Sequence, residues 1–412
     1  MSARVTAVWT SALTVFAVLL TMTAGPAEAQ VAIHADTLHT MNGPSIQNGV
    51  VIIGADGHIA RVGPASSTPI PAGYRVIRGV VATPGLVDAR TVVGLAGALN
   101  QPHDQMQLET STAMQPELRA VDAYNARDPL VDWLRSHGIT TIHTGHGPGA
   151  LISGQTMIAK TRGDEVDDAV IVPEAMIAAT FGEGGLAAQG KSPGTRAKAI
   201  ALLRAELLKA RDYATKQAGP ADKRPARDLH LEALARVTNR EVPLLVTAHR
   251  VPDILAALRV AGEFGIKVVL DGASESYLLI DRIKAANVPV ILHPTMARAA
   301  DETGNLSMET ASVLKKAGIP FAIESGYESY VPKTRVVLWE AGLAAAHGLT
   351  PDQALAAITI DAARLLGVDK RVGSLEAGKD GDVAVFDGDP LEYTTHVVDV
   401  IIDGHVVSET AQ

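Results

Sequence analysis

The chain has 412 residues, contains no cysteine and carries a formal net charge of −9. Without cysteine it can form neither disulfides nor thiolate metal sites, so any metal must be held by His, Asp, Glu or a modified Lys. The acidic balance gives no electrostatic footprint for nucleic acid, and the composition therefore favours small molecules or peptides as partners.

The first 29 residues have the pattern of a secretory signal peptide. Arg4 precedes an apolar run over residues 8–20, and small side chains at Ala27 and Ala29 suit cleavage at that point. The run is shorter than the roughly 20 residues that a transmembrane helix needs. We therefore expect residues 1–29 to be removed, leaving a periplasmic or secreted protein with no membrane contact. A retained anchor is the alternative.

Both ends of the remaining chain show strand patterns. Segments such as "NGVVIIGADGHIARVG" and "HVVDVIIDGHVV" place β-branched runs between Gly, Asn and Asp, which is typical of hairpins. Chain termini often lie close together in space. The sequence therefore predicts one composite β-sandwich domain built from residues 30–82 and 371–412.

Between these ends, short apolar runs alternate with helical stripes. Residues 195–217 and 352–366 have helical periodicity. Continuous apolar runs, typical of strands buried on both faces, occupy residues 138–145, 242–249, 265–272, 287–294 and 318–325. The alternation implies a parallel sheet, and the length without a glycine-rich phosphate fingerprint favours a barrel. We expect an α/β fold with a TIM-like (β/α)8 barrel over residues 83–370.

Polar residues close several of these runs. In a TIM-like barrel the reacting groups lie at the carboxyl ends of the strands. Any single polar residue there can be structural, but a repeated pattern predicts a common site. The residues that end the strand-like runs are Arg90, His143, His249, Asp271, His293 and Glu324.

Two long segments carry a family resemblance. The segments "ATPGLVDARTVVGL" and "ITIDAARLLGVDKRVGSLEAGKDGDVAVFDGDPLE" resemble the first barrel strand and the last helix of the amidohydrolase superfamily, most closely its imidazolonepropionase-like members. "GITTIHTG" and "VPVILHP" follow in family order, so the similarity spans roughly residues 31–407. The resemblance implies hydrolysis of a C–N bond in an amide, peptide-like or cyclic amide substrate, with hydroxide generated on a divalent metal.

The expected metal ligands are largely replaced. Arg90 and Val92 stand where the family's first strand carries two histidines, and Asp271 stands where the sixth strand carries another. His249 matches the fifth-strand histidine, whereas no lysine occurs in "AMIAATFGEGG", near the fourth-strand ligand. A guanidinium at position 90 repels a cation in the usual place.

The eighth strand has changed as well. Gly326 stands at the position of the family's aspartate, with Glu324 two residues earlier. Arg90 can then pair bidentately with Asp88, Asp271 or Glu324, which would keep the charge balance without a metal.

Three interpretations remain open. In the first, a relocated zinc ion is held by His249 and His293 together with Asp271 and Glu324. In the second, a metal-free hydrolase or lyase uses Arg90 to stabilise an oxyanion and His249 or Glu324 as general base. In the third, the barrel is a catalytically inactive exported receptor for a small molecule.

We favour the exported C–N hydrolase with a diverged or absent metal centre. Its cofactor is then either one divalent metal ion, zinc, or no metal at all. The sequence does not decide whether the protein forms a homo-oligomer. A glycine-rich loop brings His146 toward the site, and two cations beyond the eighth strand can hold a substrate carboxylate. The predicted residues are Arg90, His249, Asp271 and Glu324 for catalysis, His146, Lys333 and Arg335 for substrate binding, and His249 and His293 for metal.

Overall fold

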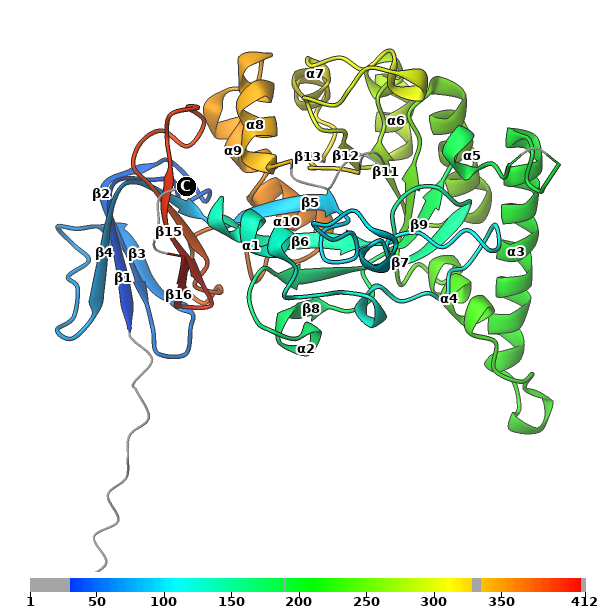
Figure 1. Cartoon of the computed structure of the whole chain (residues 1–412), viewed down its shortest axis with the longest axis horizontal. Helices are drawn as coiled ribbons and strands as arrows, with labels where there is room; N and C mark the ends of the chain where they lie inside the picture. The colour runs from blue at the N-terminus through cyan, green and yellow to red at the C-terminus, as the bar shows by residue number, and fades with distance from the viewer. Residues whose placement is uncertain (1–29, 189, 328–334, 409–412) are drawn as a thin grey trace, which may run out of the picture.

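The computed structural model describes residues 30–188, 190–327 and 335–408. The predicted signal peptide and Lys333 lie outside these residues. Figure 1 shows a β-sheet domain, built from both ends of the described chain, beside a larger barrel that is surrounded by helices. None of the helices in the described ranges is long and apolar enough to cross a membrane.

The smaller domain is one seven-stranded sheet with the order β16-β15-β14-β4-β1-β2-β3. β1 pairs antiparallel with β2 and parallel with β4, while β14 joins the C-terminal hairpin to β4. Buried β-branched side chains, including Ile33, Val51 and Ile401, form its core. The two chain ends thus share a single sheet, whereas the domain boundaries at residues 82 and 371 stay predictions. The strands are β1 (Val31–Leu38), β2 (Ile46–Ile53), β3 (Ile59–Pro64), β4 (Arg75–Pro84), β14 (Val383–Phe386), β15 (Val397–Ile402) and β16 (His405–Ser408).

The larger sheet has the order β13-β12-β11-β10-β9-β7-β6-β5, with β8 (Val170–Val172) attached to β7. It is a nearly closed, TIM-like barrel. At its seam the Gly326 amide donates to the Arg90 carbonyl at 3.0 Å, which joins the ends of the first and last strands. The barrel strands are β5 (Leu86–Thr91), β6 (Ile139–Gly145), β7 (Ile152–Lys160), β9 (Ile177–Thr180), β10 (Leu244–Thr247), β11 (Val268–Gly272), β12 (Val290–Leu292) and β13 (Phe321–Ile323).

One barrel strand corrects the expectation of a wholly parallel sheet. β7 runs antiparallel to both β6 and β9. The connection between Gly145 and Ile152 is too short for the crossover of a dozen or so residues that a parallel pair requires, so the chain reverses as a hairpin. As a result the end of β7 lies beside the start of β6, and Lys160 pairs with Thr141.

The helices surround the barrel. The prediction over residues 195–217 is confirmed by α3, which Thr195 caps by accepting from the Lys198 amide. The prediction over residues 352–366 resolves into two helices that separate at Thr359, whose backbone is not helical. The α-helices are α1 (Pro129–Ser136), α2 (Val166–Ala169), α3 (Arg196–Gln217), α4 (Leu229–Thr238), α5 (Val251–Phe264), α6 (Ile280–Ala286), α7 (Thr310–Ala317), α8 (Val337–Ala346), α9 (Pro351–Ala357) and α10 (Ile360–Leu366). Short 3₁₀ turns are η1 (Pro102–Asp104), η2 (Ala120–Asp122), η3 (Glu183–Gly185), η4 (Ala221–Lys223), η5 (Ser276–Leu278) and η6 (Asp301–Thr303).

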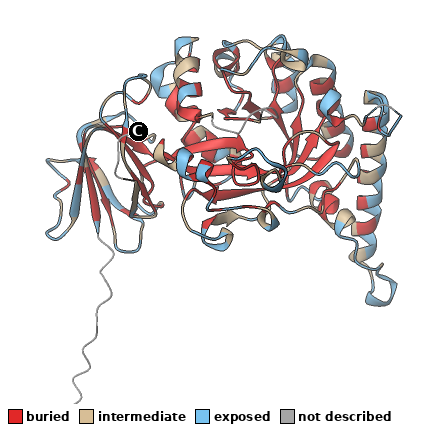
Figure 2. Cartoon of the chain, in the orientation of Figure 1, coloured by how far each residue is buried: buried red, intermediate tan, exposed pale blue. Residues whose placement is uncertain are grey.

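Apolar burial follows the strands. Buried residues concentrate along the strands and on the sides of the helices that face them (Figure 2). Leu245, Val269 and Ile291, on the neighbouring strands β10, β11 and β12, pack in one cluster with Val87 of β5 and with residues of α10. The continuous hydrophobicity of these strands is therefore explained by burial on two faces, one toward this cluster and one toward the outer helices.

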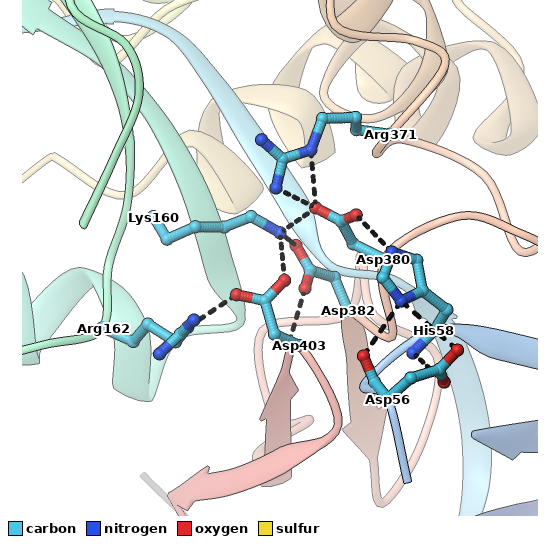
Figure 3. Close-up of polar contacts among 8 residues, drawn as sticks. All are labelled: Asp56, His58, Lys160, Arg162, Arg371, Asp380, Asp382 and Asp403. Atoms are coloured by element: carbon cyan, nitrogen blue, oxygen red, sulfur yellow. Dashed lines mark hydrogen bonds and ion pairs between the residues drawn. The ribbon is translucent and has the colours of Figure 1, made fainter. Parts of the chain in front are cut away.

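A buried ionic cluster, the Lys160 cluster, joins the barrel to the β-sheet domain (Figure 3). The Lys160 ammonium, whose side chain is only 1% exposed, lies 2.5 Å from Asp382, 2.9 Å from Asp380 and 3.1 Å from Asp403. Arg162 bonds to Asp403, and Arg371 bonds to Asp380. Burial alone lowers the pKa of Lys160, but the three carboxylates together outweigh it and raise the pKa.

Candidate active site

A cavity of about 530 Å³ lies at the carboxyl ends of the barrel strands. Because parallel strands end at the same rim, residues that close β5, β10, β11, β12 and β13 converge there. The structure thus brings together the predicted residues that line this cavity, namely Arg90, His249, Asp271, His293 and Glu324.

Arg90 does not form the predicted bidentate ion pair. Its side chain is 4% exposed and donates to the carbonyl of Thr91 at 3.0 Å and to the carbonyl of His146. Within the described ranges, no carboxylate oxygen lies within 4.0 Å of its guanidinium. Burial lowers the pKa of Arg90, while the charges of Asp271 and Glu324 act in the opposite direction. The guanidinium is therefore fixed by backbone carbonyls and acts on the carboxyl groups through its field.

Asp88 holds the seam of the barrel beneath Arg90. One of its oxygens accepts from the Arg90 amide at 3.2 Å and from the Ser325 amide at 3.0 Å. Its other oxygen is buried without a hydrogen-bond partner. Burial, only partly offset by these hydrogen bonds and by Arg90, raises the pKa of Asp88 to about 6.

Asp271 and Glu324 are two carboxyl groups that lie in the same cavity, and the charge of one acts on the other. Burial raises the pKa of Glu324 well above its ordinary value, and the charge of Asp271 and a hydrogen bond with it raise that pKa further. Thr247 donates its hydroxyl to Asp271 Oδ2. Asp271 Oδ1 and Glu324 Oε2 are buried without a partner. Burial beside a second carboxyl group therefore favours the protonated form of Glu324.

The two histidines of the cavity are neutral. His293 Nδ1 lies 2.8 Å from the carbonyl of Pro294, which can only accept, so Nδ1 carries the proton and Nε2 is a free acceptor. Burial lowers the pKa of His293 to about 4. His249 Nδ1 contacts the Ser274 hydroxyl at 2.8 Å, and burial lowers its pKa also. A Cβ at Gly272, whose φ is +72°, would lie 2.5 Å from His249 Cε1, so the ring position requires glycine there.

Two of the predicted substrate-binding residues, His146 and Arg335, are not among the residues that line this cavity. The His146 ring is buried against Gly154, where an added Cβ would lie 2.5 Å from His146 Cδ2, and only its backbone carbonyl reaches Arg90. Arg335 contacts Glu340 at 3.3 Å. The third predicted residue, Lys333, lies outside the described residues. His146 and Arg335 differ from the prediction for the same reason. Each lies past the end of a strand, where a side chain can turn toward a neighbouring segment and away from the cavity.

Sequence reasoning missed the loop after β12. It supplies Ala297, Arg298, Ala300, Asp301 and Thr303 to the cavity lining. No periodic or motif signal marks this segment, so only the fold shows that it covers the strand ends.

His143, the remaining strand-end residue, is structural, because its ring bonds to the Ala89 carbonyl and the Thr156 hydroxyl, both at 2.7 Å.

The fold and this site define a hydrolase-like TIM barrel with a small β-domain. The amidohydrolase family model matches residues 259–407. An imidazolonepropionase from Rhizobium rhizogenes is 27% identical over 397 residues, covering 87% of this chain and 91% of that protein. The solved structure of an amidohydrolase from Thermotoga maritima has a TM-score of 0.87 at 25% identity, covering 92% of this chain and all of that one.

Together these matches show that the chain is similar to amidohydrolases in sequence and fold and is imidazolonepropionase-like. They support hydrolysis of a C–N bond as its reaction class. A zinc-bound adenosine deaminase structure from Xanthomonas campestris shares the fold with a TM-score of 0.54 at 15% identity, covering 93% of each chain. Superfamily members typically use such a divalent metal.

The residues of this cavity do not fit that metal. Throughout the described part of the chain, no group of three or more His, Asp or Glu side chains is arranged to hold a metal ion. His249 and His293 line the same cavity but lack a third ligand in that arrangement. The buried Arg90 guanidinium adds a fixed positive charge at the end of the first strand, which opposes a cation there.

Proposed function

We propose that this protein hydrolyses a C–N bond in an amide, peptide-like or cyclic amide substrate without the superfamily's metal. The observation that carries the proposal is the buried Arg90 guanidinium in the same cavity as Asp271 and Glu324, each of which keeps one buried oxygen without a hydrogen-bond partner. A metal ion would normally supply positive charge and an activated water. Here the guanidinium supplies the charge, and the carboxyl pair supplies a base and an acid.

The roles follow from the protonation of each group. Asp271 Oδ1, a free acceptor, takes a proton from water as the water oxygen attacks the carbonyl carbon. The positive field of Arg90 stabilises the negative charge that develops on the carbonyl oxygen. Glu324 then gives its proton to the leaving nitrogen, and the C–N bond breaks. The neutral Nε2 of His293 accepts a hydrogen bond from the water or from a substrate N–H.

Metal analysis combined with turnover tests this mechanism. The purified protein is measured for zinc, iron, manganese and nickel, and is assayed on amides, dipeptides and cyclic amides with and without a chelator. We expect far less than one metal per chain and turnover that survives chelation. Stoichiometric zinc, with turnover lost on chelation and restored by zinc, would contradict the proposal and support the relocated zinc site.

A double substitution, Arg90→His with Val92→His, sharpens this test. It restores the first-strand pair of the family pattern, yet we expect no gain of metal-dependent turnover, because the sixth and eighth strands still carry Asp271 and Glu324. Turnover that appears only on addition of zinc would mean that the first-strand pair alone separates this chain from its relatives. Absence of turnover in the wild-type protein on the whole panel would favour the inactive receptor.

We also propose that the protein is exported and acts on a small-molecule or peptide-like substrate outside the cytoplasm. The support is the pattern of residues 1–29, a charged start followed by an apolar run and small residues. Amino-terminal sequencing of the protein from fractionated cells tests this. A mature chain that begins near Gln30 in the periplasmic or secreted fraction is expected, and an uncleaved cytoplasmic chain would contradict it.

A further inference from the structure

The loop over residues 294–306, here named the strap, covers the mouth of the cavity. It connects β12 to the turn before α7 and carries six of the residues that line the cavity. Arg90 lies at the deep end and is buried, whereas Arg298 on the strap is exposed. The two guanidinium groups therefore mark opposite ends of one cavity.

The strap is held in place by contacts outside the cavity. Thr295 donates to the Glu340 carbonyl at 2.9 Å, and the Met296 amide donates to the Glu340 carboxylate at 2.7 Å. Farther along, Glu302 accepts from Arg196 at 2.8 Å, and Asn305 donates to Glu275 at 2.7 Å. These bonds fix the strap at both ends, so the residues between them have a defined position over the cavity.

Arg298 is a cation whose charge has no partner in the described parts of the chain. Its backbone carbonyl accepts from the Thr303 hydroxyl at 2.8 Å, but its guanidinium forms no ion pair within 4.0 Å, even with Asp301 three residues later. By contrast, Arg196 at the back of the strap contacts both Asp253 and Glu302. Arg298 is also one of the residues that line the cavity.

The Arg298 guanidinium does not serve to balance charge at the deep end of the cavity. There the charges of Asp271 and Glu324 already act on Arg90. A planar guanidinium with free donors is matched best by a carboxylate, which it can bind bidentately. An amide substrate with a carboxylate at its far end would therefore satisfy both ends of the cavity.

We propose that Arg298 is a specificity-determining residue that binds a carboxylate of the substrate, remote from the bond that is cleaved. This inference rests on the proposed function in so far as the ligand is an amide. Asp301 lies on the same strap and lines the same cavity with the opposite charge. The negative charge of Asp301 therefore disfavours binding of a carboxylate. Its neutralisation should strengthen carboxylate binding, whereas neutralisation of Arg298 should weaken it.

Binding of matched probes tests the proposal. N-acetyl ω-amino acids of two chain lengths, which carry the carboxylate several carbons from the amide, and their uncharged carboxamides are titrated by calorimetry into the wild type, Arg298→Gln and Asp301→Asn. We expect the wild type to prefer the carboxylate, the preference to fall about tenfold in Arg298→Gln and to rise about twofold in Asp301→Asn. Both positions are exposed, so the unfolding midpoint should not change.

The outcomes separate this inference from the proposed function. Equal binding of acid and amide by the wild type, no binding of either, or an unchanged preference in Arg298→Gln would each overturn the role of Arg298. Turnover is measured on the same probes. Retained preference without turnover would count against the proposed hydrolysis only, whereas turnover restricted to uncharged amides would count against Arg298 only.

Discussion

Two buried ionic clusters of this barrel are built in opposite ways. The Lys160 cluster lies at the amino ends of the strands, where Lys160, Arg162 and Arg371 face three aspartates, and every charge is matched by direct contacts. The cluster around Arg90 lies at the carboxyl ends, where the guanidinium contacts carbonyls and three carboxyl groups each keep an unpartnered oxygen. A complete network stabilises a fold, whereas an incomplete one leaves groups for a ligand.

The largest expected effect is on catalysis. Glu324→Gln keeps the size of the side chain but removes the acidic proton, so kcat/KM should fall by about 10²–10⁴-fold. The free energy of unfolding should stay within about 1 kcal/mol of the wild type, because the carboxyl group that is replaced is uncharged. Steady-state kinetics and urea denaturation measure the two effects. Near-normal turnover would show that Glu324 is not the acid.

At the Lys160 cluster we expect a loss of stability without a loss of catalysis. Lys160→Met leaves three carboxylates near one another in a buried site, and should lower the free energy of unfolding by about 3–5 kcal/mol. The folded fraction should retain its kcat/KM, since Lys160 is at the far end of the strands from the cavity. Urea denaturation followed by circular dichroism measures the loss. A variant as stable as the wild type would remove the distinction between the two clusters.

Asp88 gives a smaller effect that depends on pH. Its pKa of about 6 means that it is ionised above that value and protonated below it. The ionised form accepts better from the Arg90 and Ser325 amides, so kcat/KM should rise several-fold as the pH increases through about 6. In Asp88→Asn this step should be absent. A pH–rate profile of both proteins decides it, and an unchanged step in the variant would assign the titration to another group.

The smallest effect is expected at the edge of the Lys160 cluster. Arg162 is 32% exposed and contacts Asp403 at 2.6 Å. Because a partly exposed ion pair contributes little, Arg162→Gln should lower the free energy of unfolding by about 1 kcal/mol or less. It serves as the matched control for Lys160→Met in the same denaturation series. A loss as large as that of Lys160→Met would mean that the cluster acts as one unit.

Sequence patterns predicted several barrel strands, and also the residues at their ends that line the cavity, for a physical reason. Strands buried on two faces are continuously apolar, and the polar residue that ends each of them must reach the rim, as Asp271 and His293 do. The same logic could not foresee that β7 runs antiparallel, because that depends on the length of one connection. It also predicted an ion pair for Arg90, whereas nearby backbone carbonyls take its donors.

The raised pKa of Glu324 and the position of the strap could not be predicted from the sequence. The proton on Glu324 depends on the burial of two carboxyl groups that are more than 50 residues apart in the chain, at positions 271 and 324. Arg298 lies in a segment without periodicity, so nothing in the sequence places it over the cavity. Such features appear only when distant loops and strand ends are brought together.

The carboxylate partners of Lys160 are synthesised long after the strand that carries it. They follow it by 222 residues at Asp382 and by 243 residues at Asp403. As the chain is synthesised, the third barrel strand thus carries an ammonium group that finds its carboxylates only when the C-terminal hairpin arrives. Such long-range closure is slow, and a chain that stops before residue 380 would leave this lysine unpaired beside the barrel. The charge balance at this end of β7 therefore depends on residues near the C-terminus.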